Sequence, residues 1–244
     1  MEHEQGKILP FYLVTDVSAS MTGGPLEAVN QIMPAVVDAL AETPILADKV
    51  RFALIDFGSD AQVRLPLCDP LDDTVTLPSL GIRGLTSFAA AFRLLRTEIE
   101  SNVRQLKADG FAVHRPAVFF LSDGEPTDDD QEWQDAFHDL THYDRDTKQG
   151  FPMYPNVVPC GVAQANPKTM QQLIHPSAGG KPMQMYMMNQ GQDAAKAIAM
   201  IAEILISSMV KSGESMAQGN SGLLLPDKSQ VPAGITAYNP DDFV

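Results

Sequence analysis

Three separated segments of the sequence carry oxygen-bearing side chains that could hold a metal ion. Asp16, Ser18 and Ser20 alternate directly after an apolar run. Thr86 precedes an amphipathic segment, and Asp123 follows a second apolar run. The five residues offer two carboxylates and three hydroxyls, with no His or Cys among them. Oxygen donors select hard cations, so this set suits Mg²⁺, Mn²⁺ or Ca²⁺ and not Zn²⁺.

The elements that must position these residues alternate along the chain. Four short apolar runs have the density expected of strands buried on both faces, at residues 8–16, 50–57, 116–122 and 156–163. Segments with helical periodicity follow or separate them, at residues 25–40, 86–106, 131–143 and 193–211. This order predicts an α/β fold with a doubly wound, mostly parallel sheet and helices on both faces. Residues 61–67 alternate in polarity and predict one antiparallel edge strand.

In a doubly wound sheet, ligands bind beyond the carboxyl ends of the strands. The segments holding Asp16, Thr86 and Asp123 are therefore expected to converge at one edge. Ser, Thr and Asp also favour helix N-caps and turns, so the competing interpretation is a set of capping residues. We favour a cation site over this interpretation.

The sequence Asp16-x-Ser18-x-Ser20, followed by Thr86 and Asp123, resembles the metal-ion-dependent adhesion site of von Willebrand factor A (VWA) domains. The resemblance covers about residues 7–210. Within the VWA family, the stretches 9–21, 25–30 and 122–129 are similar to the bacterial TerY-type proteins of toxic-anion (tellurium) resistance systems. Leu85 departs from the pattern, because such proteins tend to have Gly before the threonine.

The resemblance implies how the site would work. Ser18, Ser20 and Thr86 would give neutral hydroxyls to the metal, and Asp16 and Asp123 would act partly through waters. A cation with so little direct negative charge favours an incoming Glu or Asp carboxylate from a partner. The resemblance therefore implies a non-enzymatic protein-binding module in a stress or tellurium response. Relatives in such systems are associated with a protein kinase and a metal-dependent phosphatase, which are the candidate partners.

Composition narrows the classes of partner and compartment. The 244 residues include 17 Lys and Arg against 31 Asp and Glu, a formal net charge of −14. This surplus argues against nucleic acid or an anionic membrane as a partner, because both reward basic surfaces. Two cysteines cannot form a disulfide framework, and the acidic start lacks the basic segment of a signal peptide. We expect a cytoplasmic protein.

A change of composition near residue 213 suggests two parts. Residues 7–212 are expected to form the domain, and residues 213–244, rich in Gly, Ser, Gln, Pro and Asp, an extended or flexible tail. Residues 223–225 are three leucines that could either bind a partner or fold back onto the domain. The methionine-rich stretch 183–188 is predicted to be an edge strand.

Other chemistries have weaker support. His138 and His142 lie one helical turn apart near Asp135, a spacing that a zinc site could use, but no third ligand is evident. Asp128 to Asp130 are more typical of a helix cap than of a second cation site. The chain has no phosphate-binding loop and no nucleophile elbow. The alternatives to a binding module are a Mg²⁺-dependent enzyme acting on phosphate esters and a scaffold with a vestigial metal site.

Overall fold

The computed structural model describes residues 6–43, 46, 48–178, 182–220 and 222–242. The strands are β1 (Lys7–Asp16), β2 (Val50–Phe57), β3 (Ala61–Cys68), β4 (Ala112–Val113), β5 (Ala117–Ser122), β6 (Asn156–Gly161), β7 (Met185–Met188) and β8 (Ile235–Tyr238). The helices are α1 (Gly24–Ala41), α2 (Phe88–Ala108), α3 (Asp130–Thr141), α4 (Pro167–Gln172) and α5 (Ala194–Ala217), with 3₁₀ turns at Ala19–Met21 and Lys228–Gln230.

The strands form one sheet in the order β3-β2-β1-β5-β6-β7-β8, and the short β4 pairs with the start of β1. The five strands from β2 to β7 in this order run parallel, whereas β3 and β8 are antiparallel to their neighbours. The strands β1 and β5 are buried on both faces for almost their whole length. The predicted fold class is confirmed.

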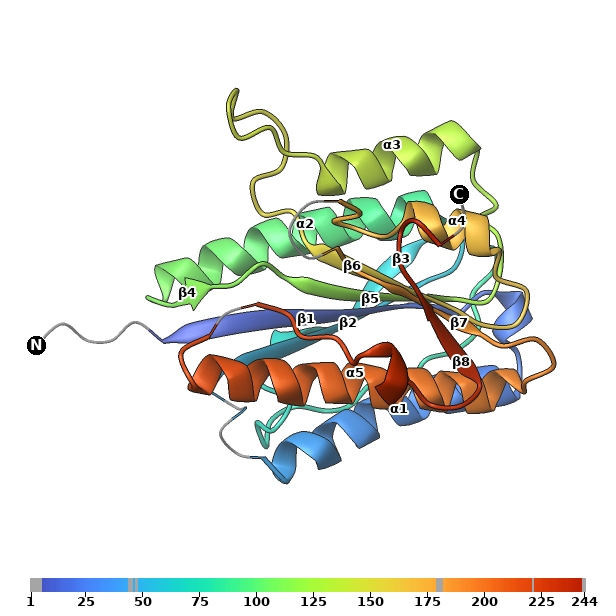
Figure 1. The fold of residues 1–244 in the computed structure, drawn as a ribbon, viewed down its shortest axis with the longest axis horizontal. Coiled ribbons are helices and arrows are strands. Elements are labelled where there is room, and N and C mark those ends of the chain that lie inside the picture. Colours follow the sequence, from blue (N-terminus) through green and yellow to red (C-terminus); the bar gives the residue numbers. More distant parts are fainter. Residues whose placement is uncertain (1–5, 44–45, 47, 179–181, 221, 243–244) are drawn as a thin grey trace, which may run out of the picture.

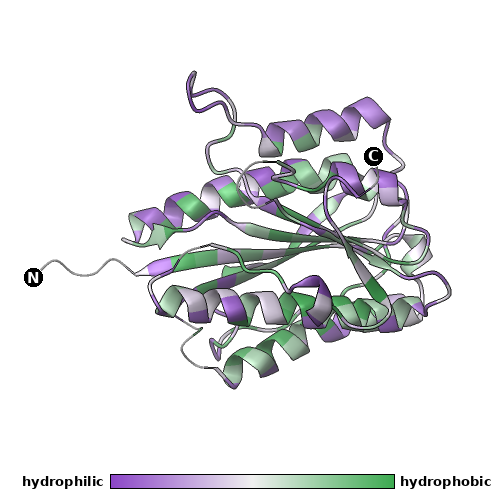
Figure 2. Ribbon diagram, in the orientation of Figure 1, coloured by the Kyte–Doolittle hydropathy of each residue, from purple (hydrophilic) through white to green (hydrophobic). Residues whose placement is uncertain are grey.

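Helices cover both faces of the sheet (Figure 1). The helices α1 and α5 pack against each other on one face, and α2 and α3 pack together on the other. Figure 2 shows that α3 is mostly hydrophilic, whereas α5 carries long hydrophobic stretches where it lies against the sheet. Among the described residues, no helix is both long and apolar enough to cross a membrane.

An aromatic cluster joins the centre of the sheet to α2. The ring of Phe120 on β5 stacks on that of Phe57 on β2, with centroids 5.0 Å apart. It also meets the ring of Phe88 edge-on at 4.9 Å and lies 5.1 Å from that of Phe92. All four side chains are at most 1% exposed. Because Phe88 is the first residue of α2, this packing fixes the helix end that follows Thr86.

The structure corrects the expected tail. Residues 213–217 continue α5, and Gly213 packs so closely against Leu46 that an added Cβ would lie 2.3 Å from a Leu46 methyl carbon. Residues 235–238 form β8, which pairs with β7 over four residue pairs. Composition hid this strand because Gly, Pro and Asp flank it, although Ile235 and Ala237 alternate toward the core. The methionine-rich strand β7 is therefore not the edge that the sequence predicted.

The leucines at 223–225 fold back onto the domain. Leu223 is 5% exposed within the core, and the backbone amide of Leu224 donates to the Ser212 hydroxyl at 2.9 Å. This observation favours the self-packing interpretation over a free docking motif.

Candidate metal centre

The carboxyl ends of β1 and β5 lie side by side at the centre of the sheet. Thr15 on β1 pairs with Leu121 on β5, so Asp16 and Ser122 end neighbouring parallel strands. The chain crosses from β1 to β2 on one side and reaches β5 on the other, which makes this edge the topological switch point of the sheet. The structure thus places the first and third predicted segments together.

Four of the five predicted residues form one hydrogen-bonded network. The Ser20 hydroxyl donates to Asp123 Oδ1 at 2.8 Å and lies 3.0 Å from the Ser18 hydroxyl. The backbone amide of Ser18 donates to Asp16 Oδ1 at 2.8 Å. The network therefore links residues more than 100 positions apart in the sequence.

Thr86 reaches the same end of the sheet through its backbone. The Gly84 carbonyl accepts from the Ala19 amide at 3.1 Å, beside Ser18 and Ser20. The Thr86 carbonyl accepts from the Thr127 amide at 2.8 Å, on the loop that follows Asp123. These two hydrogen bonds place Thr86, which is 6% exposed, between the loops that carry the other four residues.

Sequence reasoning missed Ser122 as a member of the site. Its hydroxyl donates to Asp16 Oδ2 at 2.7 Å, so both oxygens of Asp16 are held from fixed positions. The signal was available, because Ser122 is the last residue of a buried strand adjoining Asp123. A polar residue at the end of a doubly buried strand faces the ligand edge.

A buried ion pair, also missed, holds the loop before Thr86. The Arg83 guanidinium contacts Asp56 Oδ1 at 2.5 Å, and Asp56 is fully buried at the end of β2. The Arg83 amide also donates to the Val17 carbonyl at 2.7 Å. Gly58 makes this approach possible, because an added Cβ would lie 1.7 Å from the Arg83 carbonyl oxygen.

The network contains two buried carboxyl groups, those of Asp16 and Asp123. Asp16 is fully buried and Asp123 is 3% exposed. Burial raises the pKa of Asp16 to about 6 and raises the pKa of Asp123 above its ordinary value. In the described part of the chain, neither carboxylate forms an ion pair with a Lys, Arg or His. Two such carboxylates beside hydroxyl oxygens fit a hard divalent cation.

The other predicted acidic and histidine clusters have different roles. Asp129 caps α3 by accepting a hydrogen bond from the Gln131 amide. Asp128, just before α3, instead accepts from the Ala89 amide at 2.8 Å and so caps the neighbouring helix α2. The rings of His138 and His142 stack with centroids 4.5 Å apart. Within the described ranges, no group of three or more His, Cys, Asp or Glu is placed to hold a metal, so the structure does not support a zinc site at these histidines.

Asp128→Ala is expected to lower the free energy of unfolding by about 1 kcal/mol, the usual cost of losing a capping acceptor. The residue caps the start of α2, two to three positions after Thr86, so the same change should also weaken cation binding at the site. Thermal unfolding of this variant and of the exposed Asp135→Ala control measures the effect. Equal shifts in both variants would contradict the capping role.

Comparison with known proteins identifies the sequence pattern. Residues 11–126 match the family model of the von Willebrand factor type A domain. This part of the chain is similar to VWA domains. The matched segment begins on β1 and ends just after Asp123, so it contains all five candidate ligands. VWA domains commonly mediate interactions between proteins.

Solved structures share the fold of this chain. The pilus adhesin SpaC of Lactobacillus rhamnosus GG is similar with a TM-score of 0.55 and 13% identity, over 84% of this chain and 30% of that chain. Proximal thread matrix protein 1 of the mussel byssus is similar with a TM-score of 0.52 and 13% identity, over 85% of this chain and 49% of that chain. At these identities the likeness concerns the fold alone.

A curated protein also matches part of the chain. The 3-hydroxyphenylacetate 6-hydroxylase of Emericella nidulans is 28% identical over 123 residues, which is 50% of this chain. The match spans 23% of that protein's length, less than a quarter of it.

Proposed function

We propose that this VWA domain binds a protein partner through a divalent cation held by Asp16, Ser18, Ser20, Thr86 and Asp123. The observation that carries the proposal is the pair of buried carboxylates, Asp16 and Asp123, joined by hydroxyl groups and lacking a cationic neighbour. Bound Mg²⁺, or Mn²⁺ or Ca²⁺, would supply a Lewis-acidic position for a Glu or Asp carboxylate of the partner.

The candidate ligands would have different roles in such a site. Both oxygens of Asp16 already accept hydrogen bonds, from the Ser18 amide and the Ser122 hydroxyl, so Asp16 orients the loop and adds negative charge. Ser18, Ser20 and Thr86 offer neutral hydroxyls. The set therefore holds a cation without surrounding it with direct negative charge, which favours a carboxylate from outside.

The surface beside the site suits a partly apolar partner. Leu85 is 62% exposed and Ile82 36% exposed, and they are the exposed large hydrophobic residues of the described chain. Both lie on the loop that carries Thr86. Exposed apolar side chains beside a polar site are typical of interaction surfaces, so the partner segment would place an apolar residue next to its acidic one.

Calorimetric titration of Mg²⁺ into the full chain tests the proposal. We expect one saturable site in the wild type and its loss in Thr86→Val, which removes a hydroxyl while keeping the shape of the side chain. Thr97→Val makes the same change on the exposed surface of α2 and should bind as the wild type does. Acetate is then titrated into the Mg²⁺-loaded protein as a minimal carboxylate, and heat that Thr86→Val lacks is expected. Wild-type binding by Thr86→Val would overturn the proposal.

The cellular setting remains a prediction from the sequence resemblance. We propose that the domain serves in a bacterial toxic-anion (tellurium) or stress response, in the cytoplasm, with a protein kinase or metal-dependent phosphatase as the candidate partner. We also propose that it is not an enzyme. Turnover of a generic phosphate ester that is lost in Thr86→Val would contradict this part and favour the enzymatic alternative.

A further inference from the structure

A polar cavity lies at the opposite end of the sheet from the candidate metal centre. It opens beside Asn156, the first residue of β6, whereas Asp123 follows the last residue of β5. These neighbouring strands run parallel for six residues, which separates the two places by about 20 Å. The cavity has a volume of about 760 Å³, within the range of small-molecule sites. We call it the arginine cleft, after Arg115 and Arg145, which line it with His142, Tyr154 and His175.

The arginine cleft is positive in a strongly acidic protein. Two arginines and three histidines are among the described residues that line it, and none of those residues is Asp or Glu. The chain as a whole has 31 acidic against 17 basic residues, so this composition is opposite to that of the molecule. A cavity lined by one sign of charge concentrates ions of the other sign.

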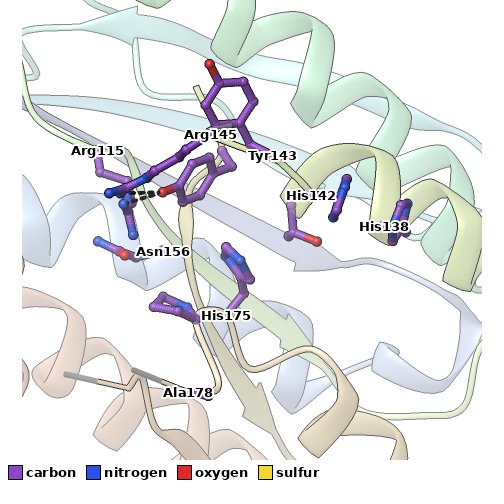
Figure 3. Close-up of a pocket in the computed structure, with 11 residues that line it drawn as sticks. Arg115, His138, His142, Tyr143, Arg145, Asn156, His175 and Ala178 are labelled. Carbon is purple, nitrogen blue, oxygen red and sulfur yellow. Dashed lines mark hydrogen bonds between the residues drawn. The ribbon is translucent and has the colours of Figure 1, made fainter. Parts of the chain in front are cut away.

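The two arginines converge on one neutral oxygen. Arg115 donates to the Tyr154 hydroxyl oxygen at 2.7 Å, and Arg145 donates to the same oxygen at 3.1 Å (Figure 3). The Arg115 guanidinium also lies 4.2 Å from the centre of the Tyr154 ring. Across the described chain, neither arginine forms an ion pair with a carboxylate. Two like charges therefore meet at one neutral oxygen, with no carboxylate of the described chain in ion-pair contact with either.

The donors that remain in the cleft are those an oxyanion needs. A phenol oxygen that accepts two hydrogen bonds keeps its own O–H as a donor. Each guanidinium keeps further N–H groups, in the planar arrangement that matches phosphate oxygens. The His175 Nδ1 atom lies 2.9 Å from the Pro155 carbonyl oxygen, and this hydrogen bond fixes the orientation of the imidazole ring. In Figure 3, His138 and His142 lie side by side at the end of α3, across the cleft from the arginines.

Asp144 and Asp146 flank Arg145 in the sequence, and in the described chain neither forms an ion pair with it. The carboxylate of Asp144 accepts from the amides of Asp146 and Thr147, at 2.8 and 3.2 Å, and so shapes the loop that carries Arg145. The loop is closed by a bridge between Tyr143 and Gly150. Arg145 is therefore held over the cleft by an ordered turn.

We propose that the arginine cleft binds the phosphate group of a small phosphate ester. Two guanidiniums match the charge of a phosphate monoester dianion, whereas a carboxylate would leave one positive charge unbalanced. The stacked rings of Tyr143 and Tyr154, 6.2 Å apart, add apolar surface for the esterified group. This site is independent of the proposed cation site, because it shares no residue with it.

Titration calorimetry in chelator, with inorganic phosphate and phenyl phosphate as probes and acetate as the reference anion, tests the proposal. We expect saturable binding of phenyl phosphate at least as tight as that of phosphate, and weaker binding of acetate. Arg145→Gln changes an exposed residue and should weaken binding about 10-fold or more, the effect of losing a hydrogen bond to a charged group. Arg115→Gln should do the same.

Two matched variants make the result decisive. Arg104→Gln removes an equal charge from α2, where Arg104 pairs with Glu100, and should bind within 2-fold of wild type. Thr86→Val should also bind normally, which separates this proposal from the cation site. Absence of saturable phosphate binding, binding of free phosphate without the ester, or an equal loss in Arg104→Gln would each overturn the proposal.

Discussion

Asp16→Asn should raise the free energy of unfolding of the metal-free protein and abolish its stabilisation by Mg²⁺. The Asp16 carboxylate is fully buried, and burial raises its pKa from 3.8 to about 6, so at pH 7 the folded protein holds an unfavourable charge. Asparagine keeps the shape of the side chain and removes the charge. The pKa shift corresponds to a gain of about 1–3 kcal/mol in the free energy of unfolding. The same change removes half of the carboxylate charge of the site, so Mg²⁺ affinity should fall at least about 100-fold.

Urea denaturation at pH 7, with chelator and with Mg²⁺, measures both effects. The wild type should gain stability with Mg²⁺, because a ligand that binds only the folded state stabilises it. Asp16→Asn should show no such gain, and the exposed Asp135→Asn should behave as the wild type. A loss of stability in metal-free Asp16→Asn would mean that Asp16 serves the fold and not a cation.

Phe120→Ala is expected to lower the free energy of unfolding by about 3–5 kcal/mol, the usual cost of removing a buried aromatic side chain. The Phe120 ring lies within 5.1 Å of the rings of Phe57, Phe88 and Phe92, so truncation leaves a cavity among three rigid neighbours. Because Phe88 begins α2, the loosened packing should also weaken Mg²⁺ binding through Thr86.

The midpoint of urea denaturation measures the loss. Phe137→Ala is the matched control, because Phe137 is only partly buried and contacts the same cluster through Phe92. It should cost about 1–2 kcal/mol and leave Mg²⁺ affinity unchanged. If both variants lost the same amount of stability and of Mg²⁺ affinity, the aromatic cluster would not be what positions the start of α2.

The central strands and the candidate ligands were predictable from the sequence. Runs such as 8–16 and 116–122 are apolar on both parities, and only a strand covered on both faces needs that composition. Once those strands are parallel, their carboxyl ends share an edge, so Asp16 and Asp123 had to approach each other. The structure adds the hydrogen bonds that link them through Ser20.

The C-terminal part could not be predicted by the same reasoning. The strand β8 has four residues between turn-forming neighbours, and its partner β7 is about fifty positions earlier in the chain. Local composition therefore indicated a tail, whereas burial of Ile235 and Ala237 against the sheet decided the strand. Strand formation here depends on a partner edge that local sequence does not reveal.

The sequence by itself determined the fold class, the order of the elements and the oxygen-rich set of candidate residues, because periodicity and residue type act locally. Tertiary structure alone decided which distant groups meet. It paired Asp56 with Arg83, assigned Asp128 to the start of α2, and brought Arg115 and Arg145 to the hydroxyl of Tyr154. These contacts depend on how separate elements pack across the sheet, and residue spacing along the chain carries no direct record of that packing.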